Sequence, residues 1–155
     1  MTDQAHRLTP LAILVVFVLA IPGSVLGQVV SLVYGFFLGG FFDGNLFNWI
    51  TGGWFKIITM AFIPNALAGG IAGFFALRVT FAIKPLKQAN YEIAAYAMSA
   101  IVVLLGVLGL LTIFAREGLS THLIESVSNA AGVIVGLFAA QQAVREDQSR
   151  VMASA

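Results

Sequence analysis

The chain has no cysteine among its 155 residues and only two histidines, His6 and His122. Without cysteine it forms no disulfide, holds no iron–sulfur cluster and offers no thiolate to a metal or a substrate. The two histidines fall on opposite sides of the membrane in the topology predicted below, which excludes a haem between them. The sequence also lacks metal-ligand spacings, a glycine-rich phosphate loop and a nucleophile arrangement. We therefore expect no enzyme activity, no cofactor and no resident metal.

Charge is equally scarce. Charged residues make up 10% of the sequence and hydrophobic residues 59%, and the mean hydropathy is +0.96. A soluble domain is roughly a quarter charged, so this chain has too little polar surface to stay in water. The net charge of +1 and the lack of a basic patch give no sign of nucleic-acid binding. The composition predicts an integral membrane protein with a single membrane domain over residues 1–155.

Charged residues divide the sequence into four stretches that are long enough to cross a bilayer. A transmembrane helix needs roughly 20 apolar residues. The predicted spans cover about residues 10–35, 56–78, 92–115 and 120–144. The expected fold class is all-α, an integral membrane bundle of about four transmembrane helices. No signal-peptide cleavage site follows the first apolar run, so we expect that run to be retained as a helix.

Local signals predict where two of these helices begin and end. Thr9 and Pro10 are typical of a helix start, with Thr9 as the N-cap and Pro10 in the first turn. Pro85 is expected to break the chain between the second and third spans, because proline lacks a backbone donor and clashes with the preceding turn.

Residues 36–55 are rich in phenylalanine and tryptophan, and their only charge is Asp43. Aromatic segments interrupted by glycine favour the membrane interface. We therefore expect an interfacial or re-entrant segment here, turning at Asp43-Gly44-Asn45. The alternative is a longer first helix that projects from the membrane.

Lysine and arginine are distributed unevenly about the predicted spans. One side carries Arg7, Arg78, Lys84, Lys87, Arg145 and Arg150. Only Lys56 and Arg116 fall on the other side. The positive-inside rule then places both termini in the cytoplasm. We expect a multi-pass protein of a bacterial inner membrane.

Small residues recur at every fourth position along the first span and share one face, as in a glycine zipper. The second and fourth spans carry shorter stripes, and the third carries few small residues. Small residues let helix backbones approach closely. The predicted helix-packing residues are Gly23, Gly27, Ser31, Gly35, Gly39, Gly69, Gly73, Gly132 and Gly136. We expect the first, second and fourth helices to make the tight contacts, either within the chain or also against another subunit.

Several polar residues fall within the predicted spans. The candidate intramembrane polar site contains Gln28, Asn65, Glu125, Ser128 and Asn129. The amide side chains of Gln28, Asn65 and Asn129 either form hydrogen bonds between helices or line a path for a solute. Glu125 lies in the outer half of its span, either on such a path or as an interfacial carboxylate paired with Arg116 or Lys56. The His122 and Glu125 pair lacks the further ligands that a metal site needs.

Two prolines, Pro22 and Pro64, each follow an isoleucine near the middle of a span. Each leaves the carbonyl four residues earlier, at Val18 and Met60, without its usual donor. Paired interruptions of this kind occur at transport sites, but they also simply bend the helices of a bundle.

Two functions remain. The first is a structural or accessory subunit that packs through its helices in a membrane complex or homo-oligomer, with lipid and other membrane subunits or further copies as partners. The alternative is a small channel or transporter subunit, including a solute-capture subunit of an importer, with a path lined by the first, second and fourth helices. We favour the assembly subunit because coupled transport needs an ionisable group near mid-membrane, and the spans show none there.

Overall fold

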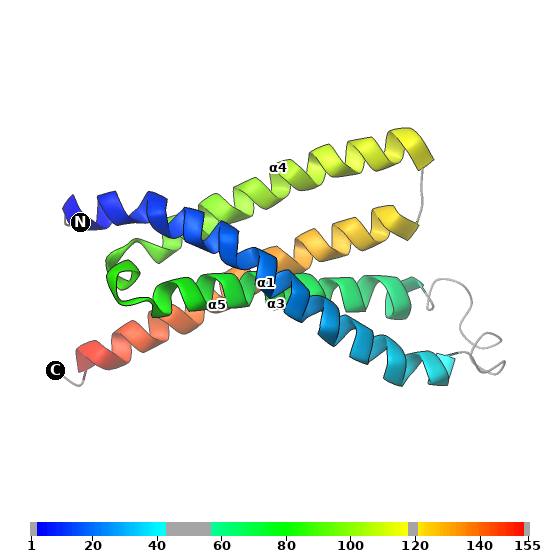
Figure 1. Cartoon of the computed structure of the whole chain (residues 1–155), viewed down its shortest axis with the longest axis horizontal. Helices are drawn as coiled ribbons and strands as arrows, with labels where there is room; N and C mark the ends of the chain where they lie inside the picture. The colour runs from blue at the N-terminus through cyan, green and yellow to red at the C-terminus, as the bar shows by residue number, and fades with distance from the viewer. Residues whose placement is uncertain (1–2, 43–56, 118–120, 154–155) are drawn as a thin grey trace.

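The computed structural model describes residues 3–42, 57–117 and 121–153, and every regular element within them is a helix (Figure 1). The long helices are α1 (Asp3–Phe42), α3 (Ile63–Ala82), α4 (Tyr91–Glu117) and α5 (Thr121–Ala153). A π-helical turn, η1 (Ile58–Phe62), precedes α3, and a short 3-10 helix, η2 (Lys84–Gln88), follows it.

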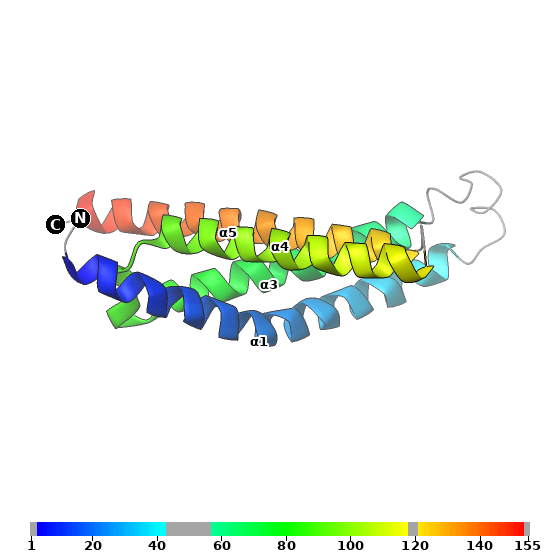
Figure 2. The ribbon, with the colours of Figure 1, turned by 90° about the horizontal axis from the view of Figure 1, so that it is seen from above.

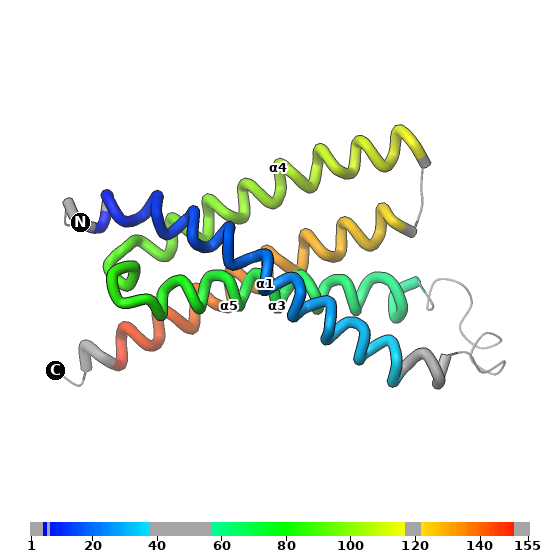
Figure 3. The backbone as a smooth tube through the Cα atoms, viewed as in Figure 1, coloured from blue at the N-terminus to red at the C-terminus, as the bar shows by residue number. Residues whose placement is uncertain are grey.

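The four long helical segments are long and apolar enough to cross a membrane. They are Arg7–Phe37, Ile58–Ala82, Tyr91–Arg116 and His122–Arg150. This finding confirms the predicted all-α class and indicates a multi-pass membrane protein. Successive long helices run back and forth along the bundle, so that α3 and α5 are parallel to each other and antiparallel to α1 and α4 (Figures 2 and 3).

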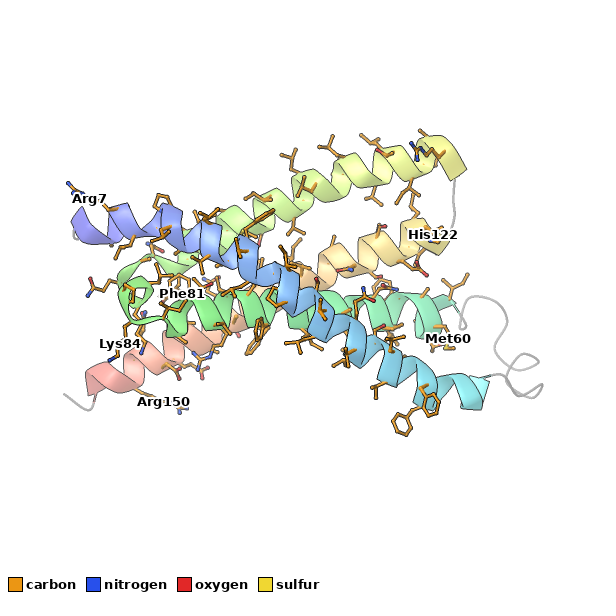
Figure 4. The ribbon with its side chains drawn as sticks, viewed as in Figure 1. Arg7, Met60, Phe81, Lys84, His122 and Arg150 are labelled. Carbon is orange, nitrogen blue, oxygen red and sulfur yellow. The ribbon has the colours of Figure 1, made fainter. Side chains whose placement is uncertain are left out.

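One end of the bundle holds the start of α1, the end of α5 and η2 (Figure 1). Arg7, Lys84 and Arg150 lie at this end, which we call the basic end (Figure 4). The opposite end, called the far end, holds the start of α5 with His122. These three residues belong to the six basic residues that were predicted to lie on one side of the membrane.

The predicted bounds of the first helix are wrong at both ends. The prediction was residues 10–35, whereas α1 begins at Asp3 and continues to Phe42. Thr9 is therefore not an N-cap, and Pro10 lies inside the helix. The cap prediction failed because the Thr9 hydroxyl acts within the helix, where it donates to the Ala5 carbonyl oxygen at 2.7 Å.

The far end of α1 also bears on the predicted aromatic segment. Residues 36–42 continue α1 as regular helix, so the predicted interfacial segment does not begin at residue 36. A helix of 40 residues is about 60 Å long, which is roughly twice the thickness of a bilayer core. The rest of the predicted segment, including the turn at Asp43, lies outside the described residues.

The second span shows how the chain accommodates Pro64. The Ile63 N–H donates to the Ile58 carbonyl oxygen, five residues earlier, which closes the π-helical turn η1. Pro64 then falls in the first turn of α3, where a missing donor costs least. The structure thus replaces the predicted mid-helix interruption with a π-helical turn followed by a new helix start. As predicted, Pro85 lies between the second and third spans, because α3 ends at Ala82 and Pro85 is the second residue of η2.

The buried core lies in the half of the bundle next to the basic end. It combines residues early in α1 and α4 with residues late in α3 and α5, such as Val16, Leu77, Met98 and Leu137. In the most apolar part of α3, 44% of residues are buried, compared with 6% in α4. This agrees with the expectation that the tight contacts are made by the other three long helices. Towards the far end α1 and α4 separate from each other (Figure 1), so their outer halves have little cover from the residues that the structure describes.

A hydrogen-bonded link ties α1 to the start of α4 at the basic end. The Asn90 backbone N–H donates to Thr9 Oγ1 at 3.1 Å, and Thr9 is only 6% exposed. The Asn90 side chain in turn accepts from the Ile93 N–H at 3.0 Å, which is the geometry of a helix N-cap. Thr9 therefore helps to fix the third span against the first, a role that its sequence position alone does not indicate.

Candidate functional site

The parallel helices α3 and α5 approach each other over two glycines of α5. A Cβ built on Gly136 would lie 2.8 Å from the carbonyl carbon of Gly70. A Cβ on Gly132 would lie 2.8 Å from the carbonyl carbon of Ala66. Real Cβ atoms essentially never come this close to backbone atoms, so any side chain at these positions forces the two helices apart.

The same interface relies on two glycines of α3. A Cβ on Gly69 would lie 2.7 Å from Asn129 Oδ1, and a Cβ on Gly73 would lie 3.1 Å from the backbone nitrogen of Leu137. Both would also overlap backbone carbonyl oxygens of α5, those of Asn129 and Val133 respectively. Four glycines from two helices thus interlock, as expected where small residues drive association in lipid.

The antiparallel contact between α1 and α3 uses two positions of the long α1 stripe. A Cβ on Gly27 would lie 2.8 Å from the Ala68 Cα, and a Cβ on Gly23 would lie 3.1 Å from the Ala72 Cα. Both glycines are buried. The central helix α3 therefore holds α1 on one side and α5 on the other.

The rest of the α1 stripe is not covered by the described part of the chain. A Cβ on Gly35 would find no described atom within 4 Å, and Ser31 is only partly buried. Gly39 belongs to α1, but its surroundings lie outside what the structure describes. On α4, Gly109 is equally open. Within the described part of the chain, the predicted stripe is thus covered at Gly23 and Gly27, where α1 meets α3, and open at Gly35.

Two of the five residues of the predicted polar site share a cavity. It has a volume of about 180 Å³ and lies among α1, α3, α4 and α5. Its polar residues are Ser24 and Gln28 from α1 and Asn129 from α5, and the remainder of its lining is apolar. Pockets for drug-sized ligands are typically about 300–1,000 Å³, so this cavity accommodates a few waters or a very small solute.

The other three residues of the predicted polar site lie elsewhere. Asn65 donates from Nδ2 to the Ala61 carbonyl oxygen of its own helical segment at 2.8 Å. Ser128 is fully buried, and its hydroxyl donates to the Glu125 carbonyl oxygen at 2.9 Å. These bonds satisfy polar groups within one helix. They do not join Asn65 or Ser128 to the cavity.

Glu125 lies at the far end of α5 beside His122. Its Oε2 is 3.4 Å from His122 Nδ1, and the two side chains are 41% and 67% exposed. In the described part of the chain this pairing takes the place of the predicted one with Arg116, while Lys56 lies outside the described residues. No group of three or more histidine and acidic side chains that could hold a metal occurs in the ranges the structure covers.

The sequence analysis missed an ion pair between α3 and α5 at the basic end. Arg78 Nη2 lies 2.5 Å from Asp147 Oδ2, and both side chains are about half exposed. The sequence does contain a sign of this pair, because Arg78 and Asp147 each lie near the C-terminal end of a span and the two spans run parallel. Two buried polar atoms, Ser99 Oγ and Gln141 Oε1, were also missed; they have no hydrogen-bond partner among the described residues and do not line the cavity.

Comparison with protein-family models, with curated proteins and with solved structures finds no match to this chain. The function must therefore be inferred from three features of the geometry. These are close helix association through glycine, an uncovered continuation of one glycine stripe, and a small cavity with few polar groups.

Proposed function

We propose that the protein is a structural or accessory subunit that packs through its helices in a membrane complex or homo-oligomer, and that the far half of α1 is its contact surface. One observation carries this proposal. Along a single stripe of small residues, Gly23 and Gly27 are covered by α3, whereas a Cβ added to Gly35 would meet no described atom within 4 Å. The same surface chemistry that holds the bundle together thus continues towards the far end to Gly35, which no described residue covers.

The residues of this surface support a helix rather than lipid as its occupant. The small residues Ser31 and Gly35 lie next in sequence to Leu32 and Phe36, which are 72% and 84% exposed. Helices associate in lipid through close packing over small residues. The exposed surface of α4 carries several large side chains that suit acyl chains. These are Val103, Leu104, Val107, Leu108 and Leu111.

Charge supports an assembly role and sets the proposed orientation. The carboxylate of Glu125 lies at the far end of its span and is partly exposed, whereas coupled transport requires an ionisable group near mid-membrane. We assign the basic end to the cytoplasm of a bacterial inner membrane by the positive-inside rule. On sequence alone, the aromatic residues between 43 and 55 suit the opposite membrane interface.

The proposal is tested by substituting one open glycine and comparing it with another. Gly35→Leu adds a large side chain to the small-residue stripe of α1, and Gly109→Leu adds the same side chain to α4; a Cβ at either position meets no described atom within 4 Å. The purified protein is studied in mild detergent by light scattering. We expect the wild type to run as an assembly larger than its own 16.4 kDa. Gly35→Leu should weaken association roughly tenfold, because overpacking costs about 1–3 kcal/mol and about 1.4 kcal/mol is a factor of ten.

Gly109→Leu should leave the assembly unchanged. A wild type that is always a single chain without partners would contradict the assembly role. An assembly that survives Gly35→Leu would show that α1 is not the contact surface.

A channel or transporter subunit is the second candidate, and the cavity with Ser24, Gln28 and Asn129 favours it. In this case the protein alone, reconstituted in liposomes, would move an ion or a small solute. Gln28→Leu would stop the flux, whereas Asn65→Leu would not, because Asn65 bonds within its own helical segment. Such a result would replace the assembly proposal.

A further inference from the structure

A second surface of the bundle, formed by α3 and α5, is hollowed into an apolar groove of about 720 Å³. The close approach of the two helices places small residues on its floor: Gly70, Gly132 and Gly136. Large side chains form its rims, and Phe74 and Val135 are 40% and 67% exposed. The groove therefore exists because glycine brings the backbones together while their neighbours project outwards.

This groove ends at a charged group. Its last lining residues on α3 towards the basic end are Arg78 and Val79, and Arg78 also lines a second cavity of about 620 Å³. Lys87, Asp147 and Phe81 line that cavity as well. Phe81 and Lys84 mark this region in Figure 4. An apolar groove and a cationic cavity thus meet at one guanidinium group.

The charge at the junction favours an anion. The cavity is lined by two cations, Arg78 and Lys87, and by one carboxylate, Asp147. Asp147 occupies one side of the guanidinium group, but arginine carries five N–H donors in a planar fork, and the Arg78 side chain is 41% exposed. Arginine binds phosphate through paired, charge-assisted hydrogen bonds. The remaining donors of Arg78 and the ammonium group of Lys87 suit a phosphate group.

The length of the groove favours a lipid. Its lining runs from Phe62 to Arg78 along α3, which corresponds to about 24 Å at 1.5 Å per residue. One leaflet contributes about 15 Å of hydrocarbon, half of a bilayer core. An acyl chain that starts at the basic end can therefore lie in the groove over its full depth in that leaflet.

We infer that the groove and the cavity together bind one anionic phospholipid from the leaflet at the basic end. Its phosphate lies against Arg78 and Lys87, and one acyl chain lies over Gly70, Gly132 and Gly136. A free phosphate ion would use only the cavity, whereas an anionic phospholipid uses both the cavity and the apolar groove. This lipid site is separate from the α1 surface proposed above for assembly.

The test uses the delipidated full-length protein in detergent and native mass spectrometry. The probes are phosphatidylglycerol, phosphatidylcholine and inorganic phosphate. We expect one phosphatidylglycerol per chain, bound at least tenfold more tightly than phosphatidylcholine and not displaced by millimolar phosphate. Arg78→Gln and Ala139→Phe, which fills the groove from α5, should each weaken binding about tenfold. Arg145→Gln, at the same end but outside both cavities, should have no effect.

Asp147→Asn separates lipid binding from the ion pair. It breaks the contact with Arg78 but keeps the guanidinium cation, so phosphatidylglycerol should bind as tightly as before or more tightly. Weakening equal to that of Arg78→Gln would show that only the ion pair matters, and would overturn the inference. Equal affinity for the two lipids, displacement by phosphate, or full binding by Ala139→Phe would each overturn it as well.

Discussion

Gly136→Ala is expected to destabilise the folded bundle by about 3 kcal/mol or more, although alanine is the better helix former. In a free helix the change from glycine to alanine gains about 1 kcal/mol. At Gly136 the added Cβ would overlap the Gly70 carbonyl and lie 2.9 Å from the backbone nitrogen of Phe74. Backbone atoms cannot turn aside as a flexible side chain can, so α3 and α5 must separate. The cost belongs at or above the upper end of the usual 1–3 kcal/mol for overpacking.

The matched control is Gly109→Ala on α4, where a Cβ meets no described atom within 4 Å. It should unfold no more easily than the wild type. The measurement is an unfolding titration with sodium dodecyl sulfate in mixed micelles, followed by circular dichroism. Because whole domains are stable by only about 5–15 kcal/mol, Gly136→Ala should also lower the yield of folded protein. Equal unfolding curves for the two variants would show that the helices do not meet as closely as described.

Reporter fusions are expected to give an all-or-none pattern along the chain. A reporter after residue 155 or inserted after Gln88 should report cytoplasm, and one inserted after Asn45 or Ser120 should report the outside. The reason is that η2 and the end of α5 share the basic end of the bundle (Figure 1). Short basic loops are retained in the cytoplasm. The measurement compares alkaline phosphatase with green fluorescent protein at each site.

Two results would contradict this topology in different ways. A cytoplasmic report at Asn45 would mean that the first stretch does not cross the membrane once. A complete reversal at all four sites would keep the four spans but refute the orientation drawn from lysine and arginine.

The spans were predictable because hydropathy and charge act locally along the chain. The extent of the α1 contact was not, because it depends on how two helices cross. The stripe on the first span continues from Gly23 to Gly39, but α3 crosses α1 at an angle (Figure 1) and covers Gly23 and Gly27 while leaving Gly35 open. Sequence periodicity identifies a face of a helix. It does not identify which helix packs against that face, or how far along the face the contact extends.

The contacts of the polar residues could not be predicted from sequence either. Their positions within the spans were clear, but the rotation of each helix about its axis is set by tertiary packing. Gln28 and Asn129 consequently share a cavity, whereas Glu125 lies beside His122 at the far end. Thr9 was predicted as an N-cap because capping rules consider only neighbours in sequence. Its hydroxyl instead accepts from Asn90, 81 residues away.

The most direct test of the assembly role is site-specific photo-crosslinking in intact membranes. Benzoylphenylalanine replaces Phe36 on the far half of α1 or Leu111 on α4, which are 84% and 62% exposed. If α1 is the contact surface, irradiation should crosslink position 36 to a second polypeptide, either another copy of the chain or a different subunit. Position 111 should give no crosslinked protein. Protein adducts absent from position 36, or equally abundant from both positions, would contradict the assembly role.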